Sequence, residues 1–330
     1  MATIRDVSKL AGVSVATVSR VLNRKGYVGE KTEQNVLAAM KALKFRPDHT
    51  ARSLAGKGSS TVGLMIPDIL NPFFPEVARA IEDVASASGF NVMLCNTVGS
   101  MDKERRYLDM LASKRVDGII IASYTIQPER LLDFMDDIPV VLIDNPLPDY
   151  PLISIACNNR DGAALAVRHL LEEGCVKIGH IRGPLQVTAA HERSLGYEEA
   201  CGSAPWFVPS LIAQGNFHIE DGQRAMLELI ERHPDLDGVF AGNDLMAIGA
   251  LQALYKLGIQ VPEQVKVIGF DGVALNMSVP ALTTVAQPIY SIGALAMELL
   301  LRLIRGESAE RKVYELDAKL LIRETTRKLR

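Results

Sequence analysis

The 330-residue sequence lacks the features of a disulfide-linked, metal-binding or membrane protein. Its four cysteines are widely separated and form no CxxC pair, and its six histidines fall at no metal-ligand spacing. Disulfides and a zinc site are therefore not expected, and reduced thiols fit a cytoplasmic protein. No apolar run is long enough to span a bilayer, and the opening residues MATIRDVSK lack the apolar core of a secretion signal. We expect a cytoplasmic protein with no cofactor, no metal and no membrane partner.

The sequence also lacks the common signatures of enzymes. The patterns GxGxxG, GxxxxGK(S/T), GxSxG and HExxH do not occur, so the usual dinucleotide loop, phosphate loop, nucleophile elbow and zinc helix are missing. Paired carboxylates such as Glu172-Glu173 and Asp136-Asp137 fit solvated helix ends better than catalytic acid–base pairs. The sequence therefore predicts a binding protein and not an enzyme.

Positive charge is concentrated at one end of the chain. The overall net charge is −3, but residues 1–60 carry eleven Lys or Arg against four Asp or Glu, a net charge of +7. The remaining residues carry a net charge of −10. A basic head on an acidic body indicates an anionic partner that binds the head alone.

Residues 1–47 have the pattern of three short helices. The sequence TIRD (3–6) resembles a capping box, with Asp in place of the usual Glu or Gln. Gly12 ends this first helix, Ser14 can cap a second, and a third is expected from about residue 30 to residue 43. The residues expected to face inward are Val7, Leu10, Ala11, Val18, Val21, Leu22, Val36, Leu37, Met40 and Leu43.

A turn residue, a capped second helix and an outer face of donors are the parts of a helix-turn-helix. Hydroxyl and amide side chains suit phosphate oxygens, and Arg20 can reach guanine O6 and N7 with two hydrogen bonds, worth about 1–3 kcal/mol of discrimination. The alternative is a helical bundle that only packs, which the positive charge of the head disfavours. The expected DNA contacts are Ser14, Val15, Ala16, Thr17, Ser19, Arg20 and Asn23.

The pattern changes after residue 60. Residues 48–60 (DHTARSLAGKGSS) form the expected boundary, where residues 50–54 could form one or two helical turns that need a partner surface. Beyond it, short branched runs alternate with helical stretches, which predicts parallel sheets, and the length predicts two α/β lobes. The runs are VGLMI (62–66), FNVMLC (90–95), GIIIA (118–122), VVLID (140–144), KIGHI (177–181), GVFAG (238–242) and KVIGF (266–270).

The segments TIRDVSKLAGVSVATVSRVLN and RPDHTARSLAGK resemble the DNA-binding head of the LacI/GalR family of bacterial transcription regulators. The resemblance implies an all-α helix-turn-helix head (1–47), a hinge helix and linker (48–60), and a body (61–330) of two doubly wound parallel-sheet lobes, like a periplasmic binding protein. The implied lobes are residues 61–157 with 288–316, and residues 158–287 with 317–330. The resemblance further implies a homodimer on a palindromic operator.

The same resemblance implies hinge helices that pair in the minor groove. Leu54 would be the wedge between base pairs, which unstacks a base step and bends the duplex. Ala55 would lie beside it, and Arg52 and Lys57 near phosphates. The alternative for Leu54 is a linker residue that packs on the body. Asp48, where the family commonly has Asn, is left out of the contacts because a carboxylate repels phosphate.

The body resembles ribose-type periplasmic sugar-binding proteins. A sugar site needs aromatic faces for C–H groups and polar side chains for hydroxyls. Each residue alone also fits a structural role, and there are departures from the family pattern at Asn158-Asn159 and Gly272. The positions that match ligand contacts are Asn71, Phe73, Phe74, Asp144, Arg193, Phe217, Asn243, Phe270, Asp271 and Gln287.

We therefore expect a DNA-binding transcriptional regulator, most simply a repressor, under allosteric control by a small sugar, with ribose or a similar pentose favoured. A hexose, a purine or a protein corepressor remains the alternative effector, and Phe73 with Phe74 would stack a purine as well. A transport receptor would need an export signal and would not carry a DNA-reading head.

Overall fold

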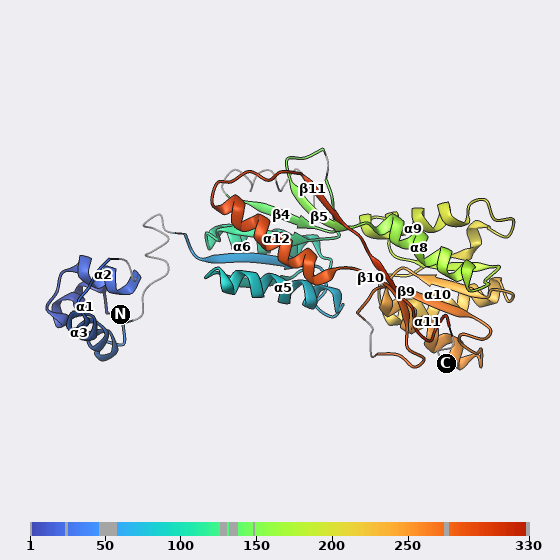
Figure 1. Cartoon of the computed structure of the whole chain (residues 1–330), viewed down its shortest axis with the longest axis horizontal. Coiled ribbons are helices and arrows are strands. Elements are labelled where there is room, and N and C mark those ends of the chain that lie inside the picture. Colours follow the sequence, from blue (N-terminus) through green and yellow to red (C-terminus); the bar gives the residue numbers. More distant parts are fainter. Residues whose placement is uncertain are drawn as a thin grey trace. The chain divides into compact units, whose positions relative to one another are not determined.

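The computed structural model describes residues 2–23, 26–45, 58–125, 131, 138–147, 149–273 and 277–327. The chain divides between Ser59 and Ser60 into two compact units, the head and the body (Figure 1). The expected hinge residues 50–54 lie outside the described residues.

The head contains α1 (Ile4–Ala11), α2 (Val15–Asn23) and α3 (Glu30–Ala42). The capping box is confirmed: the Thr3 hydroxyl accepts from the Asp6 N–H at 3.3 Å, and the Asp6 carboxylate accepts from the Thr3 N–H at 2.8 Å. Gly12 ends α1 in the left-handed conformation (φ +67°). The Ser14 hydroxyl then accepts from the Thr17 N–H at 3.1 Å, which confirms the second cap.

A small apolar core holds the three helices together. Val7, Val18 and Val36 are fully buried within it. The prediction that Leu10 and Leu37 face inward was wrong, because these side chains are 57% and 51% exposed. Three short helices cover only a narrow stripe on one another, and both leucines lie at its edge.

The first lobe of the body is a six-stranded sheet in the order β11-β5-β4-β3-β1-β2, with every neighbouring pair parallel. Helices cover both faces, so the four central strands β5, β4, β3 and β1 are buried on both sides, whereas the edge strands β2 and β11 are partly exposed. Its strands are β1 (Thr61–Ile66), β2 (Asn91–Asn96), β3 (Gly118–Ala122), β4 (Val140–Ile143), β5 (Ile153–Cys157) and β11 (Val313–Leu316). Its helices are α5 (Phe73–Ala87), α6 (Met101–Ser113) and α12 (Ile289–Ile304).

The second lobe repeats the plan, in the order β12-β10-β9-β8-β6-β7, with only the β10–β12 pair antiparallel. Its strands are β6 (Ile178–Arg182), β7 (Ile212–Gln214), β8 (Gly238–Ala241), β9 (Lys266–Asp271), β10 (Thr283–Ala286) and β12 (Lys319–Leu321). Its helices are α8 (Asn159–Glu172), α9 (Thr188–Cys201), the 3₁₀ turn Pro209–Leu211, α10 (Ile219–Arg232) and α11 (Asp244–Lys256).

Alternate strand residues pack to opposite faces of each sheet. In the first lobe, Leu64 and Ile120 pack with α5 and α12, whereas Met65 and Ile121 pack on the other face with α6. The chain passes between the lobes three times: from β5 to α8, from β10 to α12 and from β11 to β12. The predicted fold class, a helical head with two doubly wound α/β lobes, is confirmed.

All seven predicted runs form strands, but five strands were not predicted. These are β5, β7, β10, β11 and β12, each of three to five residues. Within the described residues, no helix is long and apolar enough to cross a membrane.

Replacing Gly249 with Ala is expected to destabilise the body. Its Cβ would lie 2.0 Å from the Ile219 carbonyl oxygen and 2.6 Å from the Gln223 nitrogen, both backbone atoms of α10 that cannot rotate away. Overpacking of this kind costs about 1–3 kcal/mol, against a helix-propensity gain of up to about 1 kcal/mol. Urea unfolding should show a net loss, whereas Gln252→Ala, on the exposed face of α11, should change the free energy of unfolding by less than about 0.5 kcal/mol. A Gly249→Ala protein as stable as the parent would contradict this packing.

Candidate functional site

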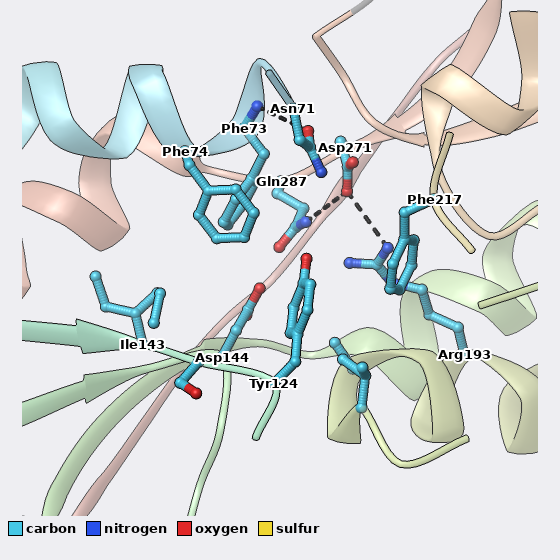
Figure 2. Close-up of a pocket in the computed structure, with 14 residues that line it drawn as sticks. Asn71, Phe73, Phe74, Tyr124, Ile143, Asp144, Arg193, Phe217, Asp271 and Gln287 are labelled. Carbon is cyan, nitrogen blue, oxygen red and sulfur yellow. Dashed lines mark hydrogen bonds and ion pairs between the residues drawn. The ribbon is translucent and has the colours of Figure 1, made fainter. Parts of the chain in front are cut away.

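The carboxyl ends of the strands of both lobes converge on one cavity. In each sheet the strand order reverses beside the first strand, at β1/β3 and at β6/β8, which is where doubly wound sheets bind ligands. The cavity is about 30 Å³ in volume, which is room for about two water molecules. It is lined by Asn71, Phe73, Phe74, Ala122, Ser123, Tyr124, Ile143, Asp144, Val187, Ala189, Arg193, Phe217, Asp271 and Gln287 (Figure 2).

Arg193 is a buried cation held by the second lobe. It lies on α9 and its side chain is 4% exposed. Its Nε donates to the Asn159 side-chain oxygen at 2.8 Å, and its Nη1 donates to the Gly242 carbonyl at 2.6 Å. Its Nη1 also lies 3.4 Å from the Asp271 carboxylate, and its guanidinium lies 3.8 Å from the centre of the Phe270 ring. These contacts fix the guanidinium before any ligand arrives.

Two carboxyl groups share the cavity with Arg193. Asp271 ends β9 and accepts from the Gln287 Nε2 at 2.8 Å. Burial raises the pKa of the Asp271 carboxyl to about 7, although the Arg193 guanidinium opposes the shift. Burial also raises the pKa of Asp144, which follows β4 in the other lobe. The cavity is therefore a poor environment for further negative charge.

Two buried acceptors in the cavity have no hydrogen-bond partner among the described residues. They are Asp144 Oδ1, from the first lobe, and Gln287 Oε1, at the end of β10. A buried acceptor without a donor costs about 1–3 kcal/mol, so the site favours a ligand that brings donors to both. Hydroxyl groups do this.

Aromatic rings supply the apolar part of the lining. Phe73 and Phe74 begin α5, with ring centres 5.1 Å apart and planes at 87°. Phe217 comes from the other lobe, after β7. The backbone is also unusual here, because Asp144, Phe217 and Asp271 have positive φ angles of 59°, 68° and 110°. Such conformations are costly for residues other than glycine and cluster at functional sites.

Eight of the ten residues predicted as effector contacts line the cavity, and two lie behind it. Asn243 caps α11, where its oxygen accepts from the Met246 N–H at 3.0 Å, and its Nδ2 donates to the Phe217 carbonyl at 3.1 Å. Phe270 is fully buried beneath Arg193. In the structure these two residues support Phe217 and Arg193 and do not face the cavity.

Six lining residues were not predicted from the sequence. Ser123 and Tyr124 directly follow β3, as Asp144 follows β4, so the rule that ligands meet strand ends would have identified them. The others are small or aliphatic: Ala122, Ile143, Val187 and Ala189.

The head presents the expected face on α2. Ser14, Val15, Ala16 and Arg20 are exposed, and Thr17 and Ser19 are half-buried. The Ser14 hydroxyl is already bonded to Thr17, through its N–H and its Oγ1 (2.9 Å). The remaining predicted DNA contacts lie outside the described part of the chain: the side chain of Asn23, and Arg52, Leu54, Ala55 and Lys57.

Comparisons with known proteins agree with this arrangement. The family profile "Bacterial regulatory proteins, lacI family" matches residues 3–48, and the profile "Periplasmic binding protein-like domain" matches residues 167–326. A protein of Halalkalibacterium halodurans named "Ribose operon repressor" is 47% identical over 99% of this chain and 98% of that protein. The chain belongs to the LacI family. This membership makes the protein a DNA-binding transcriptional regulator and not an enzyme.

Solved structures of other LacI-family proteins have the same fold. The lac repressor dimer bound to operator and the anti-inducer ONPF superposes with a TM-score of 0.88 at 27% identity, covering 98% of this chain and 99% of that chain. A periplasmic binding protein/LacI transcriptional regulator from Alkaliphilus metalliredigens, complexed with D-xylulofuranose, has a TM-score of 0.73 at 34% identity, covering 81% of this chain and 98% of that one.

Replacing Asp271 with Asn is expected to remove a pH-dependent cost of folding in this LacI-family body. The carboxyl pKa is about 7 in the native state and 3.8 ordinarily. Between these values the native state keeps a proton that the unfolded state releases, so the free energy of unfolding falls as the pH rises from about 4 to about 7. Asn cannot ionise. Urea unfolding should show that the free energy of unfolding of the parent falls relative to that of Asp271→Asn between pH 4 and pH 7. Above pH 7 the difference between the two proteins should stay constant.

Asp235→Asn is the control. Asp235 is exposed, and the Lys177 Nζ donates to it at 2.7 Å, which holds the pKa of this carboxyl below its ordinary value. The small contribution of Asp235 to the free energy of unfolding should change in the opposite direction to that of Asp271. It should increase as the pH rises through the acid range. Parallel pH profiles for the parent and Asp271→Asn between pH 4 and 7 would contradict the raised pKa.

Proposed function

We propose that this LacI-family protein is a homodimeric repressor that binds a palindromic operator and responds to a small sugar, with ribose or a similar pentose favoured. Its domains are the head (1–47), the hinge helix and linker (48–60) and the effector-binding body (61–330). The observation that carries the effector class is the pair of unpartnered acceptors, Asp144 Oδ1 and Gln287 Oε1, in a cavity with aromatic walls. A polyol brings hydroxyl donors to the acceptors and C–H faces to the rings.

The charges in the cavity favour an unphosphorylated sugar. Among the described residues that line it, Arg193 is the one Lys or Arg, and its guanidinium already contacts Asn159, Gly242 and Asp271. A phosphate group would have to approach Asp144 and Asp271 without a free cation to balance it. A neutral pentose avoids this cost.

The comparisons support the same ligand class. A relative with 47% identity is named a ribose operon repressor, and a structural neighbour is complexed with the pentulose D-xylulofuranose. The effector contacts that we propose are the eight predicted residues that line the cavity, with Asn243 and Phe270 acting through their neighbours.

The operator is read by α2 and the hinge residues. Arg20, Val15 and Ala16 are on the exposed face of α2, and they are the proposed contacts to a guanine and to a thymine methyl. The proposed phosphate contacts are the half-buried Thr17 and Ser19, together with Asn23. Leu54 is the proposed minor-groove wedge, beside Ala55, with Arg52 and Lys57 near phosphates.

A homodimer matches the two-fold symmetry of a palindrome. The lac repressor neighbour is itself a dimer on its operator.

Calorimetry with the full chain tests the effector. We expect ribose to bind and ribose 5-phosphate to bind at least tenfold more weakly, because the phosphate has no free cation in the cavity. Arg193→Ala should abolish ribose binding, since it removes the guanidinium that holds Asn159, Gly242 and Asp271 together around the cavity. Arg168→Ala, on the exposed surface of α8, should leave binding unchanged.

The same titrations decide among the alternatives. Binding of a hexose or a purine with no binding of ribose would replace the pentose assignment. Binding of none of them would leave the DNA-binding role in place and require a protein corepressor as effector.

Arg20→Ala is expected to weaken binding of the full chain to a duplex enriched from a random pool by about 1–3 kcal/mol, which is the discrimination of one bidentate guanine contact. The loss should disappear on a duplex with that base pair changed. Lys41→Ala removes one positive charge from the exposed surface of α3 and should weaken binding to both duplexes equally. Electrophoretic mobility shift at fixed salt measures both effects, and equal losses for Arg20→Ala on the two duplexes would show a phosphate contact only.

A further inference from the structure

Tyr124 is the aromatic side chain that joins the two lobes. It directly follows β3 in the first lobe, and its ring centre lies 6.1 Å from that of Phe74 in the same lobe. Its ring centre also lies 5.8 Å from that of Phe217 in the second lobe, with the planes at 32°. The Tyr124 side chain packs against the apolar cores of both lobes. Among the described ring pairs, the Tyr124–Phe217 pair is the one that crosses between the lobes.

Tyr124 also divides the space between the lobes. It lines the inner cavity of about 30 Å³ and a second, outer cavity of about 360 Å³, which Asp68, Val98 and His218 line further out. Phe217 lines both cavities as well. The outer cavity is large enough for a monosaccharide, whereas the inner one, where the unpartnered acceptors lie, holds about two water molecules. The ring of Tyr124 therefore takes up space that a sugar needs.

The phenol group of Tyr124 is directed toward the polar groups of the inner cavity. Figure 2 shows its oxygen at the tip of the ring pointing toward Gln287, with the Asp144 side chain to one side. Burial, with the nearby charges of Asp271 and Asp144, raises the pKa of this phenol above its ordinary value, so it stays protonated. An apolar ring that ends in a hydroxyl has the same two kinds of surface as a sugar.

We propose that Tyr124 is an internal plug that holds the lobes together without effector and that the effector must displace. Its ring then sets the upper size of the sugar that the inner cavity accepts. This proposal rests on the proposed effector site, because it assigns that site a specificity-determining residue. On this proposal a pentose, as the smaller sugar, requires a smaller movement of the ring than a hexose does.

The test compares the full chain with its Tyr124→Ala and Tyr124→Phe variants. Calorimetry should show that the parent and Tyr124→Phe, which keeps the ring, bind ribose and discriminate against glucose by about tenfold or more. In Tyr124→Ala that discrimination should be lost, because the space of the ring is open to the larger sugar. If Tyr124→Ala loses ribose binding and gains no larger ligand, Tyr124 is a stacking platform and the proposal is overturned.

Thr188→Ala is the matched control, because it removes a contact between the lobes and leaves the size of the inner cavity unchanged. The Thr188 hydroxyl donates to the Asn145 side-chain oxygen at 2.9 Å, which also joins the lobes, but neither residue lines the inner cavity. This variant should keep the discrimination between ribose and glucose. If it binds glucose as well as Tyr124→Ala does, the discrimination comes from lobe closure and not from the Tyr124 ring.

Hydrogen–deuterium exchange without added sugar gives a readout that does not depend on the effector. Tyr124→Ala should speed exchange of the backbone amides of residues 216–218, which face the first lobe across the cleft, by several-fold over Tyr124→Phe. Unchanged exchange overturns the plug. Faster exchange, with no sugar bound by any variant, would retain the plug and reject the proposed sugar effector. Thermal melting checks that each variant is folded.

Discussion

The buried guanidinium of Arg193 is the interaction on which the cavity between the lobes depends. A cation removed from water must find several partners, because an unpaired buried charge costs more than a fold can tolerate. Its four partners come from three places: Asn159 at the start of α8, Gly242 after β8, and Phe270 and Asp271 at the end of β9. The strand ends of the second lobe must therefore lie where they do for this side chain to be buried.

The same side chain ties the cavity to a lobe crossing. Asn159, which accepts from Arg193, also donates to the Cys157 carbonyl at the end of β5. A second crossing follows Gln287, whose amide donates to Asp271 and whose oxygen has no partner in the described part of the chain. The effector contacts that we propose are thus neighbours of the segments about which the lobes would turn. Occupation of the cavity and the relative position of the lobes cannot change independently.

The sequence predicts the parts of this arrangement that follow from local pattern. Seven strands were found because they are runs of branched residues in a parallel sheet, whereas β7 and β12 have three residues each and carry too little pattern. Leu10 shows the opposite error, because it was predicted to be buried and is exposed. Helical spacing gives the face of a helix that packs but not how far a small core extends across it. Polar residues at strand ends could be read directly, and the same rule applied to the residues after β3 would have included Tyr124. The positive φ angles of Asp144, Phe217 and Asp271 depend on packing between elements and have no signal in the sequence.

The unpartnered acceptors explain how a ligand could control the lobes. An effector shifts an equilibrium only as far as its affinity differs between the two states. Asp144 Oδ1 belongs to the first lobe and Gln287 Oε1 ends a strand of the second, so one small polyol satisfies both only when the lobes are together. Two hydrogen bonds contribute about 0.5–1.5 kcal/mol each. Their combined free energy is therefore similar to the coupling free energy of about 1–3 kcal/mol that is typical of allosteric proteins. The coupling needs no strong single contact, and it acts in both directions, so a partner that holds the lobes together also tightens the sugar site.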